Sequence, residues 1–247
     1  MHMAMPAQSR SALKACQNIS LHPPLKMTKI IKAELHCHTV YSQDSSNCIP
    51  QMLTAAREIG LDRLTITDHN EIKGAWIAKE MDPELVIVGE EILTEKGELL
   101  AYYISEKIPK NLSAMDTIKS LKDQGAFIAI PHVFDRRRHG WLLEDLLEVL
   151  PYVDALEVFN ARCFSKKIND LARAFAESNN LPMIAGSDAH SLAEVGLATV
   201  TLPEFNSADE LRVALKSAAI EGRLLSPMEH LKTSALIRLG RLKHWKK

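Results

Sequence analysis

The feature that most constrains the fold is an alternation of short apolar runs, rich in β-branched residues, with helical patterns. It begins near Lys29 and continues almost to the end of the chain. Such alternation is typical of βα units around a parallel sheet or barrel. The predicted strands are Ile30–Leu35, Arg63–Thr67, Val86–Ile92, Leu99–Ile104, Phe127–Ile130, Ala155–Phe159, Met183–Ala185 and Ala198–Leu202. One connection, Thr94–Glu98, joins two strands through Gly97 and predicts a hairpin, so a barrel of eight regular units is not expected.

Two helices carry clear end signals. The first begins at Ser113, with an acidic residue three positions later, and is predicted to end at Gly125. The second begins at Ser207 with the same spacing and is predicted to end at Gly222. In both, the serine side chain caps the first turn, and the glycine supplies the backbone freedom that a helix end requires.

Residues 27–225 are predicted to form a single α/β domain. Residues 226–247 carry Leu231, Ala235, Leu239 and Leu242 at helical spacing among basic residues, which predicts a basic amphipathic helix packed on the barrel. A contact of this helix with a membrane or nucleic acid is the alternative. Residues 1–26 contain no acidic residue and are predicted to be disordered or to precede a native start near Met27, with a transit peptide as the alternative.

Composition narrows the class of protein. The 247 residues are 46% hydrophobic and 25% charged, with a formal net charge of -1. This is too apolar for a disordered chain, and the charge gives no general attraction to nucleic acid or anionic lipid. The four cysteines form no C-x-x-C pair, and no stretch reaches 18 consecutive apolar residues. We therefore expect a protein of a reducing compartment, the cytoplasm, without a membrane span.

Histidines and carboxylates gather where the predicted strands end. They are His36, His38, Asp68, His69, Glu90, Glu91, His132, Glu157, Asp188 and His190. In a parallel barrel these strand ends meet on one face, where active sites are built. The pairs His36/His38 and Asp188/His190 have i, i+2 spacing, so the two side chains of each pair point the same way on an extended chain. Imidazole with carboxylate suits zinc, manganese or iron, and the set predicts a centre of several metal ions.

The order of these motifs resembles the polymerase and histidinol phosphatase (PHP) domain family. The motifs are Glu34-Leu-His-Cys-His-Thr, Thr67-Asp-His-Asn, Gly89-Glu-Glu, Pro131-His, Glu157-Val-Phe-Asn and Gly186-Ser-Asp-Ala-His, and the resemblance covers about residues 27–225. It implies a distorted (β/α)7 barrel with two or three divalent ions at the carboxyl ends of the strands.

The resemblance also implies a ligand set. His36, His38, Glu91 and Asp188 would hold one metal; Glu91 would bridge to a second that also takes His132; Asp44, His69 and His190 would form a third site. Many relatives carry a histidine at the position of Glu98, so Glu98 is either a ligand of the second metal or a solvated turn residue. The choice between two and three ions stays open. Relatives similar to a nucleotide phosphatase also carry a helical insertion between Tyr103 and Pro131 that this chain lacks.

A centre of this kind predicts hydrolysis of phosphate esters by a metal-bound hydroxide, without a covalent enzyme intermediate. Glu91, as the bridging ligand, and Asp68, beside His69, are the candidate catalytic residues. Asp68 could orient a ligand or accept a proton, or it could simply cap a strand end. The candidate substrate contacts are Arg162, Asn160 and Arg136, which lie near the ends of predicted strands on the same face. Arg136 begins the run Arg136-Arg137-Arg138-His139 just after His132, and a solvated loop is the alternative for this run.

Three functions fit these observations. The first is a phosphatase for small phosphomonoesters, such as mononucleotides or a phosphorylated metabolite. The second is a phosphodiesterase or exonuclease, since the same metals serve both reactions; the low aromatic content of 5% and the neutral charge give a nucleic acid partner no support. The third is a non-catalytic metal-binding module. The oligomeric state is left open by the sequence.

Overall fold

The computed structural model describes residues 29–244, with side chains up to residue 239, so the prediction for residues 1–26 lies outside the described part. The strands are β1 (Ile30–Cys37), β2 (Arg63–Ile66), β3 (Val86–Leu93), β4 (Glu98–Tyr102), β5 (Phe127–Ile130), β6 (Ala155–Asn160), β7 (Met183–Gly186), β8 (Ala198–Pro203) and β9 (Ala219–Gly222). The helices are α1 (Ile49–Glu58), α2 (Lys73–Met81), α3 (Ala114–Asp123), α4 (Leu143–Val149), α5 (Lys166–Ser178), α6 (Ala208–Ala214) and α7 (Pro227–His244). No described helix is both long and apolar enough to cross a membrane.

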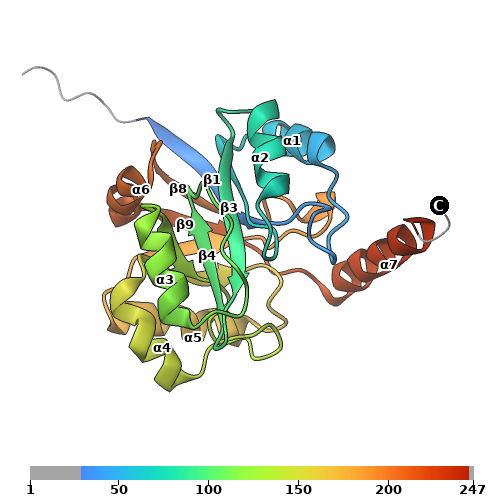
Figure 1. Cartoon of the computed structure of the whole chain (residues 1–247). Coiled ribbons are helices and arrows are strands. Elements are labelled where there is room, and N and C mark those ends of the chain that lie inside the picture. Colours follow the sequence, from blue (N-terminus) through green and yellow to red (C-terminus); the bar gives the residue numbers. More distant parts are fainter. Residues whose placement is uncertain (1–28, 245–247) are drawn as a thin grey trace, which may run out of the picture.

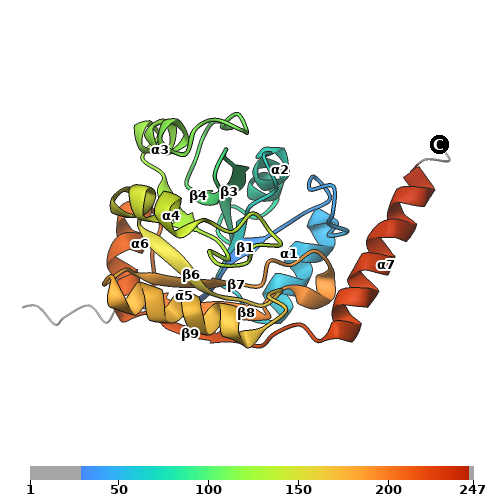
Figure 2. The same cartoon turned by 90° about the horizontal axis from the view of Figure 1, so that it is seen from below.

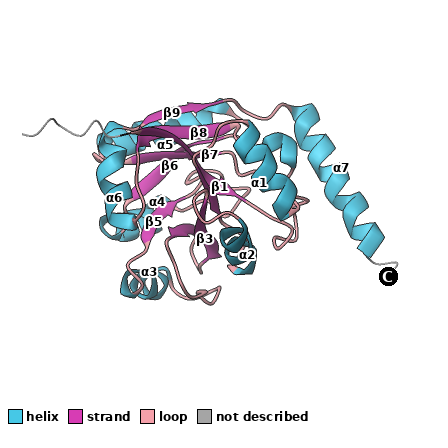
Figure 3. Ribbon diagram, turned by 90° about the horizontal axis from the view of Figure 1, so that it is seen from above, coloured by secondary structure: helices cyan, strands magenta, loops and turns pink. Residues whose placement is uncertain are grey.

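The strands form one curved sheet in the order β7-β6-β5-β4-β3-β2-β1-β8-β9. Its two halves close toward each other where β1 ends, because Cys37 forms a parallel bridge to Ala189 and the Asp188 N–H donates to the His36 carbonyl at 2.7 Å. Strands β1 to β7 thus surround a nearly closed barrel, with helices on the outside (Figures 1 and 3). The predicted α/β barrel is confirmed.

The barrel departs from regular βα repetition at β3 and β4. These strands are antiparallel neighbours, with Leu93 paired to Glu98, and Thr94 closes the turn by accepting from the Gly97 N–H through its side chain. The predicted hairpin is therefore correct. Because β4 runs against β3, the start of β4 lies at the same end of the barrel as the end of β3, and Glu98 reaches the face where the parallel strands terminate.

Apolar side chains fill both sides of the sheet, as the strand pattern requires. Inside the barrel, the rings of Tyr102 and Phe127 stack with centroids 5.4 Å apart. Outside, Leu99 and Ile128 belong to a cluster that packs against the helices. This fully packed barrel is a rigid base, and the residues that extend beyond the strand ends are positioned by it.

Two helix-end predictions have different outcomes. The helix after Ser113 is α3; the serine hydroxyl accepts from the Asp116 N–H, and Gly125 follows the helix with φ of +71°, as predicted. The helix after Ser207 is α6, but it ends at Ala214, far before Gly222. The intervening residues turn and form β9, which pairs antiparallel with β8. The glycine at position 222 therefore ends an edge strand instead of a helix, because sheet pairing replaced the predicted helical turns.

The C-terminal helix α7 differs from its predicted packing. It projects from the body of the molecule (Figures 1 and 2). Leu231, Ala235 and Leu239, which were expected to face the barrel, are exposed, whereas Thr233 is buried against it. The contact is made by a polar face of the helix, and the leucine-bearing face points to solvent.

Candidate metal centre

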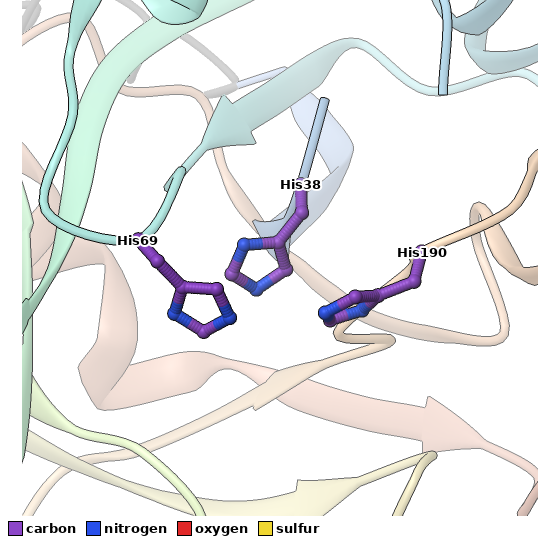
Figure 4. Close-up of side chains that lie close together, drawn as sticks. All are labelled: His38, His69 and His190. Carbon is purple, nitrogen blue, oxygen red and sulfur yellow. The ribbon is translucent and has the colours of Figure 1, made fainter. Parts of the chain in front are cut away.

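The nine predicted metal ligands converge on one face of the barrel. They come from β1 and the residues after it (His36, His38, Asp44), from the end of β2 (His69), from the β3–β4 hairpin (Glu91, Glu98), from the end of β5 (His132) and from the residues after β7 (Asp188, His190). Eight of them, all but Asp44, fall into overlapping sets of three whose ligand atoms lie within 4.8 Å of one another. One set is His38, His69 and His190 (Figure 4). Segments far apart in the sequence therefore meet at one cluster of imidazole and carboxylate groups.

Glu91 lies at the centre of this cluster. Its Oε2 is 3.3 Å from His36 Nε2, 3.2 Å from His38 Nε2 and 3.0 Å from His69 Nδ1, while its Oε1 is 2.9 Å from His132 Nε2. Burial alone would raise the pKa of Glu91, but the neighbouring histidines, led by His36, hold it well below the usual range. A carboxylate with nitrogen ligands around both oxygens has the geometry of a bridging ligand.

Glu98 and Asp44 lie on two sides of Glu91 and the histidines. Glu98 is almost fully buried, and burial followed by the negative charge of Glu91 raises its pKa to about 9. Asp44 approaches His190 Nε2 at 3.2 Å and His69 Nε2 at 3.5 Å. Burial makes the ionised form of Glu98 unfavourable, and a divalent cation in the cluster would stabilise that form. The residues present therefore fit a metal centre. Glu98 is buried and is not a solvated turn residue, and its role as a metal ligand stays a prediction.

Hydrogen bonds behind the cluster orient the histidines. His36 Nδ1 is 2.9 Å from Glu157 Oε1, and His38 Nδ1 is 3.1 Å from Ser42 Oγ. An ionised carboxylate only accepts, and the Ser42 hydroxyl already donates to Asp68, so both Nδ1 atoms carry the proton. Nε2 of each ring is then directed at the cluster, and the neutral ring would offer the lone pair of that atom to a metal ion.

Asp68 lies behind the cluster. It is fully buried, and its oxygens accept hydrogen bonds from Thr39 N, Thr39 Oγ1 and Ser42 Oγ at 2.6 to 2.7 Å. Because Ser42 also contacts His38, these bonds favour the interpretation in which Asp68 orients a ligand. The catalytic role of Asp68 stays a prediction.

The predicted substrate contacts occupy three different environments. Arg162 lines the pocket beside the cluster and pairs with the buried Glu194 at 2.8 Å. Asn160 is fully buried and donates to Glu157 and Asp188. Arg136 lines a separate pocket beside Gly97. Asn160 and Arg136 therefore do not line the pocket that contains the cluster, whereas Arg137 does, and their roles as substrate contacts stay predictions.

Arg138 is the member of the arginine run that contacts the predicted ligand Asp188. Its guanidinium donates to Asp188 Oδ2, Asn160 Oδ1 and Asp135 Oδ2, which leaves Asp188 Oδ1 facing His38. Asp135 in turn holds the loop closed through the Gly140 N–H. The run of three arginines was visible in the sequence, but nothing in it distinguished the internal member from its neighbours.

The carboxylate behind His36 yields a first prediction. Glu157 accepts hydrogen bonds from His36 Nδ1 and from the His132 backbone N–H. In the Glu157→Gln variant, the side-chain N–H₂ group would point at one of these two donors. We expect manganese to bind about 10-fold to 100-fold more weakly, since residues that orient a metal ligand have effects of this size. Isothermal titration of the metal-free protein measures it. Glu177→Gln, on the exposed surface of α5, is the control, and equal affinity of both variants would contradict the role of Glu157.

Comparisons with known proteins agree with this centre. Residues 34–132 match the model of the PHP domain, and residues 167–220 match that of the PHP-associated region. The uncharacterised protein MJ0417 of Methanocaldococcus jannaschii is 35% identical over 188 residues, which cover 71% of this chain and 72% of that protein.

Three solved structures share the fold at low identity. PsfC of Pseudomonas syringae has a TM-score of 0.66 at 18% identity, covering 85% of this chain and 98% of that one. A candidate metal-dependent phosphoesterase of Bifidobacterium adolescentis scores 0.55 at 18%, covering 79% and 97%. A lesion-specific endonuclease of Pyrococcus furiosus scores 0.56 at 17%, covering 78% and 58%. The chain belongs to the PHP domain family and has its metal-dependent phosphoesterase fold.

Proposed function

We propose that the protein hydrolyses small phosphomonoesters at this centre. The observation that carries the proposal is the position of the ligand cluster at the base of a pocket of about 340 Å³ with a cationic wall. That wall contains Arg137, Arg138, His139 and Arg162. A pocket of this volume accommodates a small molecule, and guanidinium groups bind phosphate oxygens with directed pairs of N–H donors.

The chain contributes orientation and charge to the reaction. When bound, divalent ions would lower the pKa of water toward neutrality and polarise the phosphoryl group. Glu91 would bridge two of them, and His36, His38, Glu98, His132, Asp44, His69, Asp188 and His190 would supply the remaining ligands. Glu157 and Ser42 hold the histidines in the metal-binding tautomer. Arg137 and Arg162 would bind the non-bridging oxygens and stabilise the negative charge that develops in the transition state.

The arginine run provides a matched pair of variants. Arg137 lines both the pocket with the ligand cluster and the neighbouring pocket, whereas Arg136 lines only the neighbouring one. We expect Arg137→Ala to raise KM by about 10-fold with a smaller change in kcat, because a charge-assisted bond to phosphate is lost. Arg136→Ala is expected to leave both constants unchanged. Steady-state kinetics of the two variants on one phosphomonoester measures the difference, and a larger loss in Arg136→Ala would reject the assigned pocket.

A phosphodiesterase or exonuclease is the second candidate. It is favoured by Phe164, which is 60% exposed and lies 5.2 Å from the Arg137 guanidinium. One face of this ring stacks on His230, with centroids 4.4 Å apart, and an exposed aromatic ring beside a cation can contribute to the binding of a base. Among the described residues near the pocket wall, Phe164 is the one exposed aromatic ring of this kind. We therefore prefer phosphomonoester hydrolysis as the function.

A substrate panel separates the two. Manganese-loaded protein is assayed for phosphate release from sugar phosphates, histidinol phosphate, mononucleotides and nucleoside bisphosphates, and for mononucleotide release from short oligonucleotides. Release from one monoester class, abolished by a chelator and restored by manganese, is the expected result. Release from oligonucleotides alone would select the phosphodiesterase. No turnover in the presence of bound metal would reject both.

A further inference from the structure

The outer face of α7 is an apolar row with basic neighbours. Leu231 and Leu239 are 66% and 58% exposed, and Ala235 lies between them at the same four-residue spacing. Lys232 and Arg238 are exposed next to this row. In residues 227–247 the sequence has six Lys or Arg residues and one acidic residue. We call this face the α7 row.

The orientation of α7 is fixed by its opposite face. Thr233 is buried and shares a hydrogen bond of 3.1 Å with Ser191, and it also bonds to Glu194. The His230 ring stacks on Phe164 with centroids 4.4 Å apart. Because these contacts hold the inner face, the helix cannot rotate to bury its leucines on its own barrel. The α7 row must stay in water or meet another molecule.

A second apolar row lies on α4, with the opposite charge. Leu143 and Leu147 are 55% and 49% exposed and are one helical turn apart. Glu144 and Glu148 form the adjacent exposed row, also one turn apart. The inner face of α4 is buried through Leu146 and Val149, so this helix too has a fixed outer face. Residues 142–150 contain three acidic residues and no basic one. We call this face the α4 row.

The two rows match in spacing and in charge. Each has leucine or alanine side chains at i, i+4, which is the ridge by which helices most often pack in globular proteins. When the leucines of the α4 row lie against those of the α7 row, Glu144 and Glu148 come beside the basic residues of α7. Pairing α7 with another α7, or α4 with another α4, would instead oppose like charges.

The rows cannot meet within one chain. Figures 1 and 2 show α4 and α7 at opposite sides of the barrel. We propose that α7 of one copy docks on α4 of a second copy. Because the two rows lie at opposite sides of the barrel, this contact is heterologous and joins copies head to tail, in a ring or an open chain. The loop that carries Arg137 and His139 leads directly into α4, so this contact would also brace the wall of the metal pocket.

Sedimentation equilibrium of the full chain tests the proposal. We expect a weight-average mass above the chain mass of 27.6 kDa that rises with concentration in the micromolar range. Leu147→Glu and Leu239→Lys should each weaken this association by about 100-fold or more, since each places a charge within an apolar contact that the assembly buries. Both residues are exposed in the single chain, so both variants should fold, as circular dichroism would verify. Leu171→Glu, at a similarly exposed leucine of α5, is the control and should associate as the wild-type chain does.

Mixing the two variants identifies the contact. A 1:1 mixture of Leu147→Glu and Leu239→Lys retains one intact pair, α7 of the first variant against α4 of the second, and should regain dimers that neither variant forms alone. A monomeric wild-type chain at 100 µM would overturn the proposal. It would also be overturned if Leu147→Glu remained associated while Leu239→Lys dissociated, which would indicate pairing between α7 helices, or if a monomeric chain bound vesicles of anionic lipid through the α7 row.

Discussion

Replacing Asp188 with asparagine is expected to lower kcat/KM for a phosphomonoester by about 10³-fold or more while the fold remains intact. Asp188 Oδ1 lies 3.2 Å from His38 Nε2, and Oδ2 accepts from Arg138 and Asn160. An asparagine must direct its N–H₂ group either at these donors or at the ligand cluster. In both cases one set of contacts becomes repulsive, and the negative charge that a metal ion would require is lost.

The backbone conformation of residue 188 is compatible with asparagine. Asp188 has φ of +54°, a left-handed conformation that asparagine also adopts readily, so the substitution should not strain the chain. Asp209→Asn is the control, because Asp209 is 93% exposed and pairs only with Arg212 among the residues the structure describes. Kinetics, metal content and circular dichroism are measured on both. Retained activity with native metal content in Asp188→Asn would remove this residue from the proposed centre.

A methyl group at Gly186 is expected to destabilise the protein by about 3 kcal/mol, at the upper end of the cost of overpacking a core. A Cβ at this position would lie 2.2 Å from His36 Cβ and 2.6 Å from Glu157 Oε1. The first neighbour is attached directly to the backbone of β1 and cannot rotate away. Gly186→Ala must therefore displace the strand that carries His36, and we expect weaker metal binding together with a lower urea midpoint.

Gly125 serves as the control that distinguishes steric overlap from backbone strain. Gly125 has φ of +71° and no atom within 4 Å of its Cβ position, so Gly125→Ala should cost only about 1 kcal/mol and leave metal binding unchanged. Urea unfolding and manganese titration of the two variants measure the difference. Equal midpoints and equal metal affinity would show that β1 and β7 can separate without loss, contrary to the close packing described here.

The sequence predicted which histidines and carboxylates gather on one face because their positions follow from local rules, whereas the choice of Asp44, Glu91 and Glu98 as ligands rested on the family resemblance. Histidines at i, i+2 and carboxylates at strand ends are visible without knowledge of the fold, and the parallel arrangement brings strand ends together. The role of Arg138 could not be predicted in this way. It depends on a contact with Asp188, 50 residues away, and on a loop closed by Asp135. Which of three adjacent arginines points inward is decided by that loop's backbone, not by residue type.

Dependence on long-range contacts also explains the errors in the fold prediction. Ser207 caps a helix locally, so the start of α6 was predictable. Its end was not, because Ala219–Gly222 are extended by hydrogen bonds to β8, which is a tertiary interaction. For α7, the leucine spacing correctly indicated a helix but not which face would pack. Thr233 and His230 anchor it through polar and aromatic contacts that a hydrophobic pattern does not register.

The β3–β4 hairpin has a consequence for the evolution of the centre. Glu98, Leu100 and Tyr102 share the inner face of β4, while Leu99 faces the outer helices. The residue type at position 98 can change without disturbing this alternation. A single insertion or deletion within Thr94–Gly97 would instead exchange the two faces, bringing Leu99 to the metals and Glu98 to the apolar exterior. Divergence within the family at this corner should therefore proceed by substitution of the ligand, with the length of the turn held constant.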